Sequence, residues 1–158
     1  MAEDNCIFCK IARGVIPSTT VYEDEDFRVI LDLGPASKGH SLILPKKHFA
    51  NVCELDAETA AKVLPLGAKI GAAMKKGLGC AGFNLVQNNG EAAGQTVMHF
   101  HMHVIPRYEG GPANIANWYR YSIRRRINGS SREDQRLSVV TYDQTYGSIL
   151  SCVNLQLM

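Results

Sequence analysis

The alternation of apolar and polar residues along the chain predicts five short strands. β-branched and aromatic residues flank an acidic turn at residues 23–26, a pattern typical of a β-hairpin. A third apolar run ends at Pro45, and two more runs follow beyond residue 80. The predicted strands cover residues 20–22, 27–31, 39–44, 83–86 and 99–105.

Apolar residues at helical spacing predict two helices. The first covers residues 6–13 and ends at Gly14, and the second covers residues 56–74. Pro65 lies inside the second helix, and because proline has no N–H to donate, we expect a kink or a break into two pieces there. Since helices and strands do not alternate regularly, we expect an α+β fold with an antiparallel sheet.

Composition favours one domain in a soluble protein. The chain has 158 residues, of which 46% are hydrophobic, enough to bury a substantial core. Residues 1–116 carry 11 Lys and Arg against 12 Asp and Glu, so we expect no dedicated nucleic-acid surface on this part. No apolar run approaches the roughly 20 residues that a membrane-spanning helix requires, so we expect no membrane partner.

Cysteine usage favours the cytoplasm. The chain has five cysteines, an odd number, at irregular spacing, and it begins without a cationic and then apolar leader. Both features are untypical of a secreted disulfide framework. We therefore expect a cytoplasmic protein.

Three histidines alternate in the last predicted strand. His99, His101 and His103 would line one face of it, with about 6.6 Å between neighbours at a rise of about 3.3 Å per residue. A solvated sheet face or a purely metal-binding row would also give this pattern, although apolar residues would stabilise a structural strand better. A neutral imidazole is a good nucleophile, so the central His101 is the candidate to attack phosphorus and form a covalent intermediate.

Attack on phosphorus also requires donors that neutralise the phosphate oxygens. The suitable groups near the histidines are His103, Asn88, Gln95 and the hydroxyl or backbone N–H of Thr96.

Several sequence blocks together resemble a known family. They are His-x-His-x-His at 99–103, Gly-Gln-Thr-Val at 94–97, Gly-His-Ser-Leu-Ile-Leu-Pro-Lys at 39–46 and Cys-Ile-Phe-Cys-Lys-Ile at 6–11. In order and spacing they resemble the histidine triad (HIT) superfamily, and within it bacterial-type members of the Hint branch. The agreement covers about residues 5–107, roughly two thirds of the chain.

The resemblance implies a fold and a reaction. The fold is a HIT-like five-stranded antiparallel sheet with two helices per protomer, extended to ten strands across a homodimer. The reaction is hydrolysis or transfer of a purine nucleotide from a nucleoside 5'-phosphoramidate or similar AMP-X substrate, through a covalent nucleotidyl-histidine. By position, His101 matches the nucleophile, His103 the phosphate-binding histidine and His40 the upstream histidine that supports them.

The resemblance also implies a nucleotide pocket. Asp32 matches the ribose-binding carboxylate, Asn88 and Thr96 match phosphate contacts, and the base-contacting positions are Phe8, Ile30 and Leu33. From the residues alone, Asp32 could be a turn acceptor and Asn88 a loop residue, and the spacing of the three apolar positions would place them in the core.

A Cys-x-x-Cys pair near the N-terminus indicates a second site. Cys6 and Cys9 alone fit either a zinc site or a redox pair, and no strand precedes them as in a thioredoxin-like unit. With the spare imidazoles of His48 and His99 they would form a closed tetrahedral zinc site of the structural kind, which some members of the family have. Empty reduced thiols are the third alternative.

Other questions stay open on the sequence. We expect a HIT domain at 1–116 and a C-terminal extension at 117–158, basic and aromatic at first, that is poorly ordered rather than a contact for acidic leaving groups or nucleic acid. The rival functions are a dinucleoside polyphosphate hydrolase of the fragile histidine triad branch and a non-catalytic nucleotide-binding or scaffold protein. The preference for adenine or guanine stays open.

Overall fold

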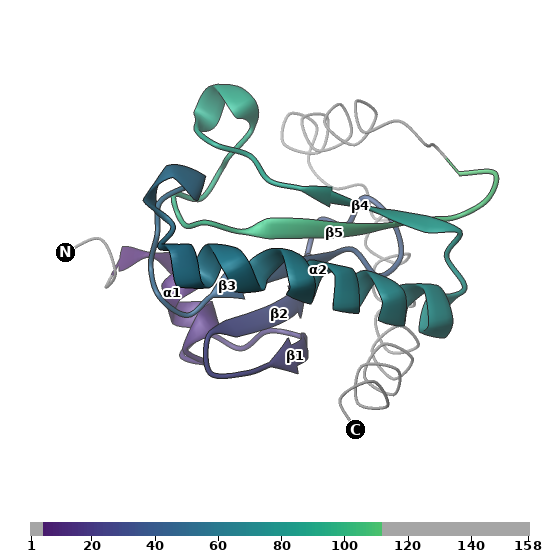
Figure 1. Ribbon diagram of the computed structural model, residues 1–158, viewed down its shortest axis with the longest axis horizontal. Helices are drawn as coiled ribbons and strands as arrows, with labels where there is room; N and C mark the ends of the chain where they lie inside the picture. Colours follow the sequence, from purple (N-terminus) through teal and green to yellow (C-terminus); the bar gives the residue numbers. More distant parts are fainter. Residues whose placement is uncertain (1–4, 112–158) are drawn as a thin grey trace, which may run out of the picture.

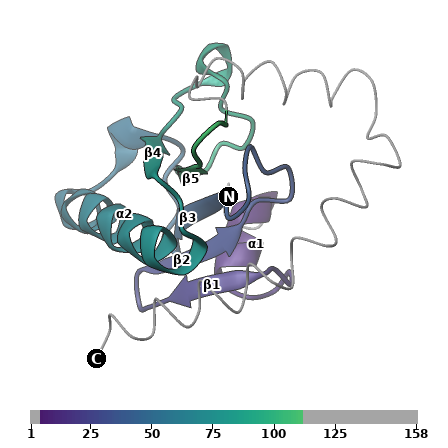
Figure 2. The same ribbon diagram turned by 90° about the vertical axis from the view of Figure 1, so that its right-hand side faces the viewer.

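The computed structural model describes residues 5–111, which form an antiparallel sheet with a helix on each face (Figures 1 and 2). The sheet has the five antiparallel strands predicted, and their order is β1-β2-β3-β5-β4. The strands are β1 (Thr20–Glu23), β2 (Phe27–Leu31), β3 (Ser41–Pro45), β4 (Gly82–Val86) and β5 (Met102–Arg107). The helices are α1 (Ile7–Ala12) and α2 (Ala57–Leu78), with 3-10 turns η2 (Val52–Glu54) and η3 (Glu91–Ala93).

The two faces of the sheet carry different residues. Phe27, Val29, Ile43 and Val104 belong to the large core under α2, whereas alternate residues such as Leu42 point to the other face, where α1 lies. Figure 2 shows α2 and α1 on opposite sides of the strands. Phe100, Met102 and Val104 all lie in the α2 core, so the histidines that alternate with them lie on the α1 side.

The long helix α2 is continuous through Pro65, so of the two alternatives predicted there, a kink or a break, the break is wrong. Asp56 caps its start by accepting a hydrogen bond from the Thr59 N–H at 2.8 Å, and Gly79 ends it in a left-handed conformation with φ of 66°. Pro65 is exposed, and buried residues precede and follow it on the inner face of the helix. Packing of that face outweighs the one hydrogen bond that proline removes.

Two glycines bring α2 close to the sheet. A methyl group at Gly71 would overlap the ring of Phe83 on β4. At Gly67 a methyl group would lie 2.9 Å from the Met102 side chain on β5. The strand that carries His103 therefore packs directly beneath the helix.

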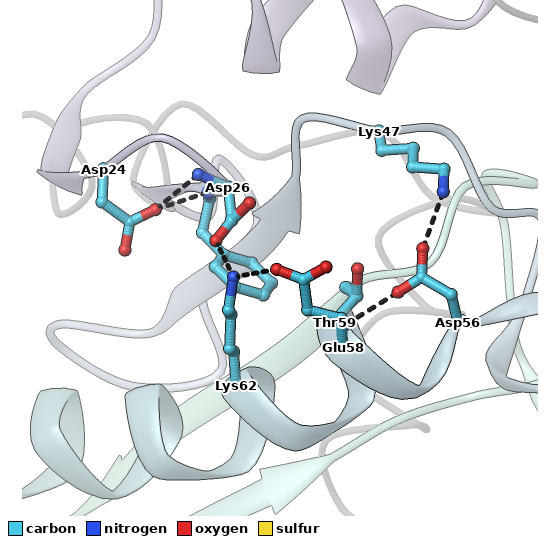
Figure 3. A network of polar contacts seen from close by, with 8 residues as sticks. Asp24, Asp26, Lys47, Asp56, Glu58, Thr59 and Lys62 are labelled. Carbon is cyan, nitrogen blue, oxygen red and sulfur yellow. Dashed lines mark hydrogen bonds and ion pairs between the residues drawn. The ribbon is translucent and has the colours of Figure 1, made fainter.

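Charged side chains fasten the start of α2 to the β1–β2 turn. Lys62 bridges Asp26 at 2.7 Å and Glu58 at 2.6 Å, and Lys47 contacts Asp56 at 2.7 Å (Figure 3). In the turn itself, Asp24 accepts hydrogen bonds from two backbone N–H groups. All these ion pairs are solvent-exposed, so each contributes little to stability.

The last strand begins later than predicted. β5 starts at Met102, so His99 and His101 lie in the segment before it and His103 alone of the three lies in a strand. The cause is a turn in which His99 N donates to Val97 O at 2.8 Å, after which Phe100 N bonds to Phe49 O instead of to a neighbouring strand.

The structure leaves two sequence predictions untested at this level. The domain boundary at 116/117 and the extension 117–158 lie outside the described residues. Among residues 5–111, no helix combines the length and the apolar character needed to cross a membrane.

Candidate active site

Three of the histidines form a buried, continuous row on the α1 side of the sheet. The ring centroid of His103 lies 5.1 Å from that of His101 and 5.1 Å from that of His40. All three residues are at least 94% buried. The ring centroids of His101 and His103 thus lie closer together than the 6.6 Å predicted for a regular strand, and His101 precedes β5.

A backbone amide sets the proton positions of His40 and His103. The Ala36 N–H donates to His40 Nδ1 at 3.0 Å, so the proton of the neutral His40 ring is on Nε2. That Nε2–H donates to His103 Nδ1 at 2.9 Å. His103 therefore carries its own proton on Nε2, which makes Nε2 a hydrogen-bond donor.

His101 has the opposite tautomer. Its Nδ1 lies 2.7 Å from the backbone carbonyl oxygen of His99, which can only accept, so Nδ1 carries the proton. Nε2 of His101 is left with a free lone pair. The row thus presents a nucleophilic nitrogen on His101 beside a donor on His103.

Burial keeps these rings neutral. It lowers the pKa of His40 to about 3, with a smaller contribution from the positive charge of Arg107. Burial also lowers the pKa of His101. The pKa of His103 is lowered mainly by burial and further by the neighbouring imidazoles of His40 and His101. At neutral pH the lone pair of His101 is available without prior loss of a proton.

Asp32 lies beside the row at the end of β2. Its Oδ1 accepts from the Gly34 N–H at 2.8 Å, as a turn residue would. Its Oδ2 lies 3.6 Å from His40 Nδ1 and 4.0 Å from His103 Nδ1. These are not ion pairs, since both imidazoles are neutral, and Oδ2 stays free to accept from a ligand hydroxyl.

The loop between β2 and β3, which holds Ala36, is fastened to the region of β5. Ser37 Oγ donates to the Pro106 carbonyl at 2.6 Å, and the Tyr108 hydroxyl donates to the Lys38 carbonyl at 2.9 Å. These bonds fix the position of the Ala36 amide relative to the histidines. The sequence gives no signal for Ala36, because its contribution is a backbone N–H.

The structure brings together two of the three predicted base-contacting residues. Phe8 packs edge-on against His101 with ring centroids 5.1 Å apart, and it joins Ile30 in the cluster on the α1 side. Leu33 does not join them, since it is 84% exposed at the loop after β2.

The loop after β4 holds the remaining predicted phosphate contacts. Asn88 is half-buried and Thr96 is exposed. Gln95 is 2% exposed, and both hydrogens of its amide are taken, by the carbonyls of Ala50 at 2.6 Å and Val97 at 2.9 Å. In this structure both donors of the Gln95 amide are thus used by the backbone, and its predicted contact with phosphate stays a prediction.

Four predicted metal ligands converge beside the histidine row. Their ligand atoms all lie within 4.8 Å of one another, and they belong to Cys6, Cys9, His48 and His99. Cys6 caps the start of α1 and Cys9 follows one turn later. His48 follows β3, and His99 precedes His101.

The geometry of this cluster fits zinc. Bond lengths of about 2.3 Å to sulfur and about 2.0 to 2.1 Å to nitrogen place neighbouring S and N ligands about 3.6 Å apart and two N ligands about 3.3 Å apart in a tetrahedron. His99 Nδ1 lies 3.5 Å from Cys6 Sγ, 3.4 Å from Cys9 Sγ and 3.2 Å from His48 Nδ1. Since His99 Nε2 lies 3.0 Å from the Pro45 carbonyl, it carries the proton, and Nδ1 presents a lone pair to the cluster.

Comparison with known proteins agrees with the motifs. A family model described as the HIT domain matches residues 13–110. The chain belongs to the HIT domain family. The family assignment made from the sequence motifs is thus confirmed.

Relatives of this HIT protein include two named enzymes. It is 44% identical over 119 residues to adenosine 5'-monophosphoramidase hnt1 of Schizosaccharomyces pombe, covering 75% of this chain and 86% of the relative. It is 39% identical over 135 residues to adenylylsulfatase HINT3 of Arabidopsis thaliana, covering 85% of this chain and 66% of the relative.

A solved structure shares the fold. The Zn-bound histidine triad family protein of Mycobacterium smegmatis matches this HIT protein with a TM-score of 0.75 and 29% identity, over 98% of this chain and 96% of that one. The predicted five-stranded antiparallel fold with two helices is confirmed by this likeness and by the described residues.

Proposed function

We propose that this HIT protein is a nucleotide hydrolase that cleaves nucleoside 5'-phosphoramidates or similar AMP-X substrates. One observation carries the proposal: the opposite tautomers of His101 and His103 set a free lone pair beside an N–H donor in a buried row. Nucleophilic displacement at phosphorus requires this pair of groups.

The reaction has two steps. His101 Nε2 attacks the α-phosphorus, so that an N–P bond forms as the P–X bond breaks and X leaves with the bonding electrons. His103 Nε2–H donates to a phosphate oxygen and stabilises the charge that develops there. X takes up a proton from the solvent as it leaves. Water then cleaves the N–P bond: its oxygen bonds to phosphorus, which releases the nucleoside monophosphate and restores His101, and its proton returns to the solvent.

Residues around the row would hold the nucleotide. The free Oδ2 of Asp32 suits a ribose hydroxyl, and Phe8 and Ile30 offer an apolar surface to a purine. Leu33, exposed beside Asp32, is placed to extend that surface over a bound base. Asn88 and Thr96 would contact the phosphate, while His40 acts through His103.

The names of the relatives favour this substrate class. One is an adenosine 5'-monophosphoramidase and the other an adenylylsulfatase, and both names describe cleavage of a nucleotide from a group bound to its phosphate. The rival hydrolysis of dinucleoside polyphosphates and the non-catalytic function receive no support from these two names.

We further assign Cys6, Cys9, His48 and His99 to a structural zinc ion. The four ligands form a closed set, which leaves no position for substrate, and a Zn-bound relative has the same fold. Such a metal would fix α1 and the segment before β5 relative to each other. Thiolate ligands need a reducing compartment, which is consistent with a cytoplasmic protein.

We also propose a homodimer in which two β4 strands pair and extend the sheet to ten strands. Among the described residues β4 and β1 are the edge strands, and β1 is protected by an irregularity between Thr20 and Tyr22. β4 pairs regularly along all five residues. Light scattering during size-exclusion chromatography should give twice the chain mass, and a monomer at micromolar concentrations would exclude this interface.

The function is tested with purified protein and two substrates, an adenosine phosphoramidate and a diadenosine polyphosphate. We expect AMP release from the first, and covalent adenylylation that is lost in His101→Ala. That variant should keep its affinity for AMP within about tenfold, because the nucleophile acts mainly in the transition state.

Other results would change the conclusion. A clear preference for the polyphosphate would establish the rival hydrolase. Binding of AMP without turnover of either substrate would establish a non-catalytic nucleotide-binding protein, and adenylylation of His101→Ala would refute the assignment of the nucleophile.

A further inference from the structure

Gln95 is a buried glutamine whose amide bonds only to backbone. Its Oε1 accepts from the Gly90 N–H at 2.8 Å, and its Nε2 donates to the carbonyls of Ala50 and Val97. Gly90 and Val97 lie in the loop after β4, the latter at the turn before His99, and Ala50 lies in the segment after β3 that holds His48. One side chain thus joins the loop proposed to hold phosphate to backbone two residues from each histidine of the metal cluster.

Two further bonds tie the same segments together. The Val52 N–H donates to Asn89 Oδ1 at 2.9 Å, and the Phe100 N–H donates to the Phe49 carbonyl. The Val97 carbonyl that Gln95 holds also accepts from the His99 N–H at 2.8 Å. A shift of the loop at residues 87–97 would therefore move the backbone on which His99 is placed.

We infer that Gln95 is a positioning residue that couples nucleotide binding to metal binding. This inference rests on the nucleotide and zinc sites proposed above. A nucleotide that orders the loop at 87–97 orders Val97, whose carbonyl Gln95 and the His99 N–H both contact, and orders the Ala50 carbonyl through Gln95. It thus holds His99 and His48 in place for the metal. Linkage makes the effect reciprocal, so the metal raises affinity for the nucleotide by the same factor.

The coupling is measured at equilibrium. The zinc affinity of the full chain is determined by competition with a chromophoric chelator, without AMP and with saturating AMP. In the wild type we expect AMP to tighten zinc binding at least about fivefold, the lower end of ordinary coupling between sites. AMP affinity, measured by calorimetry with and without zinc, should change by the same factor.

The variant Gln95→Glu tests the residue. Glutamate has nearly the same shape and keeps an acceptor for the Gly90 N–H, but it has no N–H and can donate at most one hydrogen bond, when protonated, in place of two. We expect its coupling factor to fall to about one. Glu91→Gln is the control, since Glu91 is exposed in the same loop and the change also alters one charge, so its coupling factor should equal that of the wild type.

The possible outcomes distinguish the coupling, the proposed function and the role of Gln95 from one another. A coupling factor of one in the wild type, with both ligands bound, overturns the coupling and leaves the proposed function intact. Absence of AMP binding in the wild type refutes the proposed function as well. A wild-type factor in Gln95→Glu would show that the two sites communicate only through overall folding, and would overturn the assignment of Gln95.

Discussion

Replacing His40 by asparagine or by glutamine separates the two hydrogen bonds that its imidazole makes. Asparagine places an oxygen near the position of Nδ1, so it can still accept from the Ala36 N–H, but it cannot reach His103. Glutamine places an N–H near the position of Nε2 and can still donate to His103 Nδ1. The two variants therefore test whether His40 fixes the position of the proton on His103 or only occupies space in the buried row.

The expected magnitude follows from the hydrogen bond that each variant keeps. Without the 2.9 Å bond from His40, His103 is free to move its proton to Nδ1 and to present a lone pair to the phosphate. Loss of one preorganised donor to a developing anion lowers kcat by about 10² to 10³. For His40→Asn we expect a fall in kcat on the order of 10²-fold, and for His40→Gln a fall of less than about tenfold.

The assay is single-turnover release of AMP from an adenosine phosphoramidate, with AMP affinity measured separately by calorimetry. Affinity for AMP should change less than kcat in both variants, because the donor matters most in the transition state. Equal losses of kcat in the two variants, or wild-type kcat in His40→Asn, would refute the role of His40 in fixing the tautomer of His103.

Three further predictions concern metal, packing and pH. Changing Cys6 and Cys9 to serine should remove about one zinc per chain, as measured by metal analysis. It should also lower Tm by more than about 5 °C, which is the shift that a loss of roughly 1 kcal/mol gives in a domain of this size. An unchanged zinc content would reject the site. Gly71→Ala should lower the free energy of unfolding in urea by about 1 to 3 kcal/mol, because the methyl group overlaps an aromatic ring, whereas Gly82→Ala, which meets nothing within 4 Å, is the control that should change it less. Burial lowers the pKa of His40 from about 6.5 in the unfolded chain to about 3 in the folded one, so between these values the unfolded state binds more protons. The free energy of unfolding should therefore decrease as the pH is lowered from 6.5 towards 3, by up to about 1.4 kcal/mol per pH unit. Urea titrations at pH 7 and 5 measure this slope, and His40→Asn should be less steep; an equal slope would contradict the burial of a neutral His40.

The strands and the long helix were predictable because their residues alternate or repeat on one face. The boundary of β5 was not, because a backbone hydrogen bond from Phe100 to Phe49 replaces strand pairing there and leaves no trace in the pattern. The continuity of α2 through Pro65 depends on packing against the sheet, which the local sequence does not reveal.

The candidate site was predictable as a set of residues but not as a set of functions. The sequence motifs located the histidines and the cysteines, whose ligand atoms converge in the structure. They did not reveal that the Gln95 amide is used by backbone carbonyls, nor that the Ala36 N–H and the Pro45 carbonyl set the tautomers of neighbouring imidazoles. These contributions come from backbone N–H and C=O groups, whose positions depend on the path of the chain and not on the residue type.

The dependence of the imidazoles on main-chain partners has a consequence for mutational tolerance. His40, His99 and His101 are each oriented by a backbone group that almost any side chain would leave in place. Position 36 can therefore vary widely among natural variants or in a saturation library without loss of chemistry, provided that the loop keeps its path. Proline is the one residue that would fail there on chemical grounds, since it alone lacks the N–H from which the proton order of His40 and His103 begins.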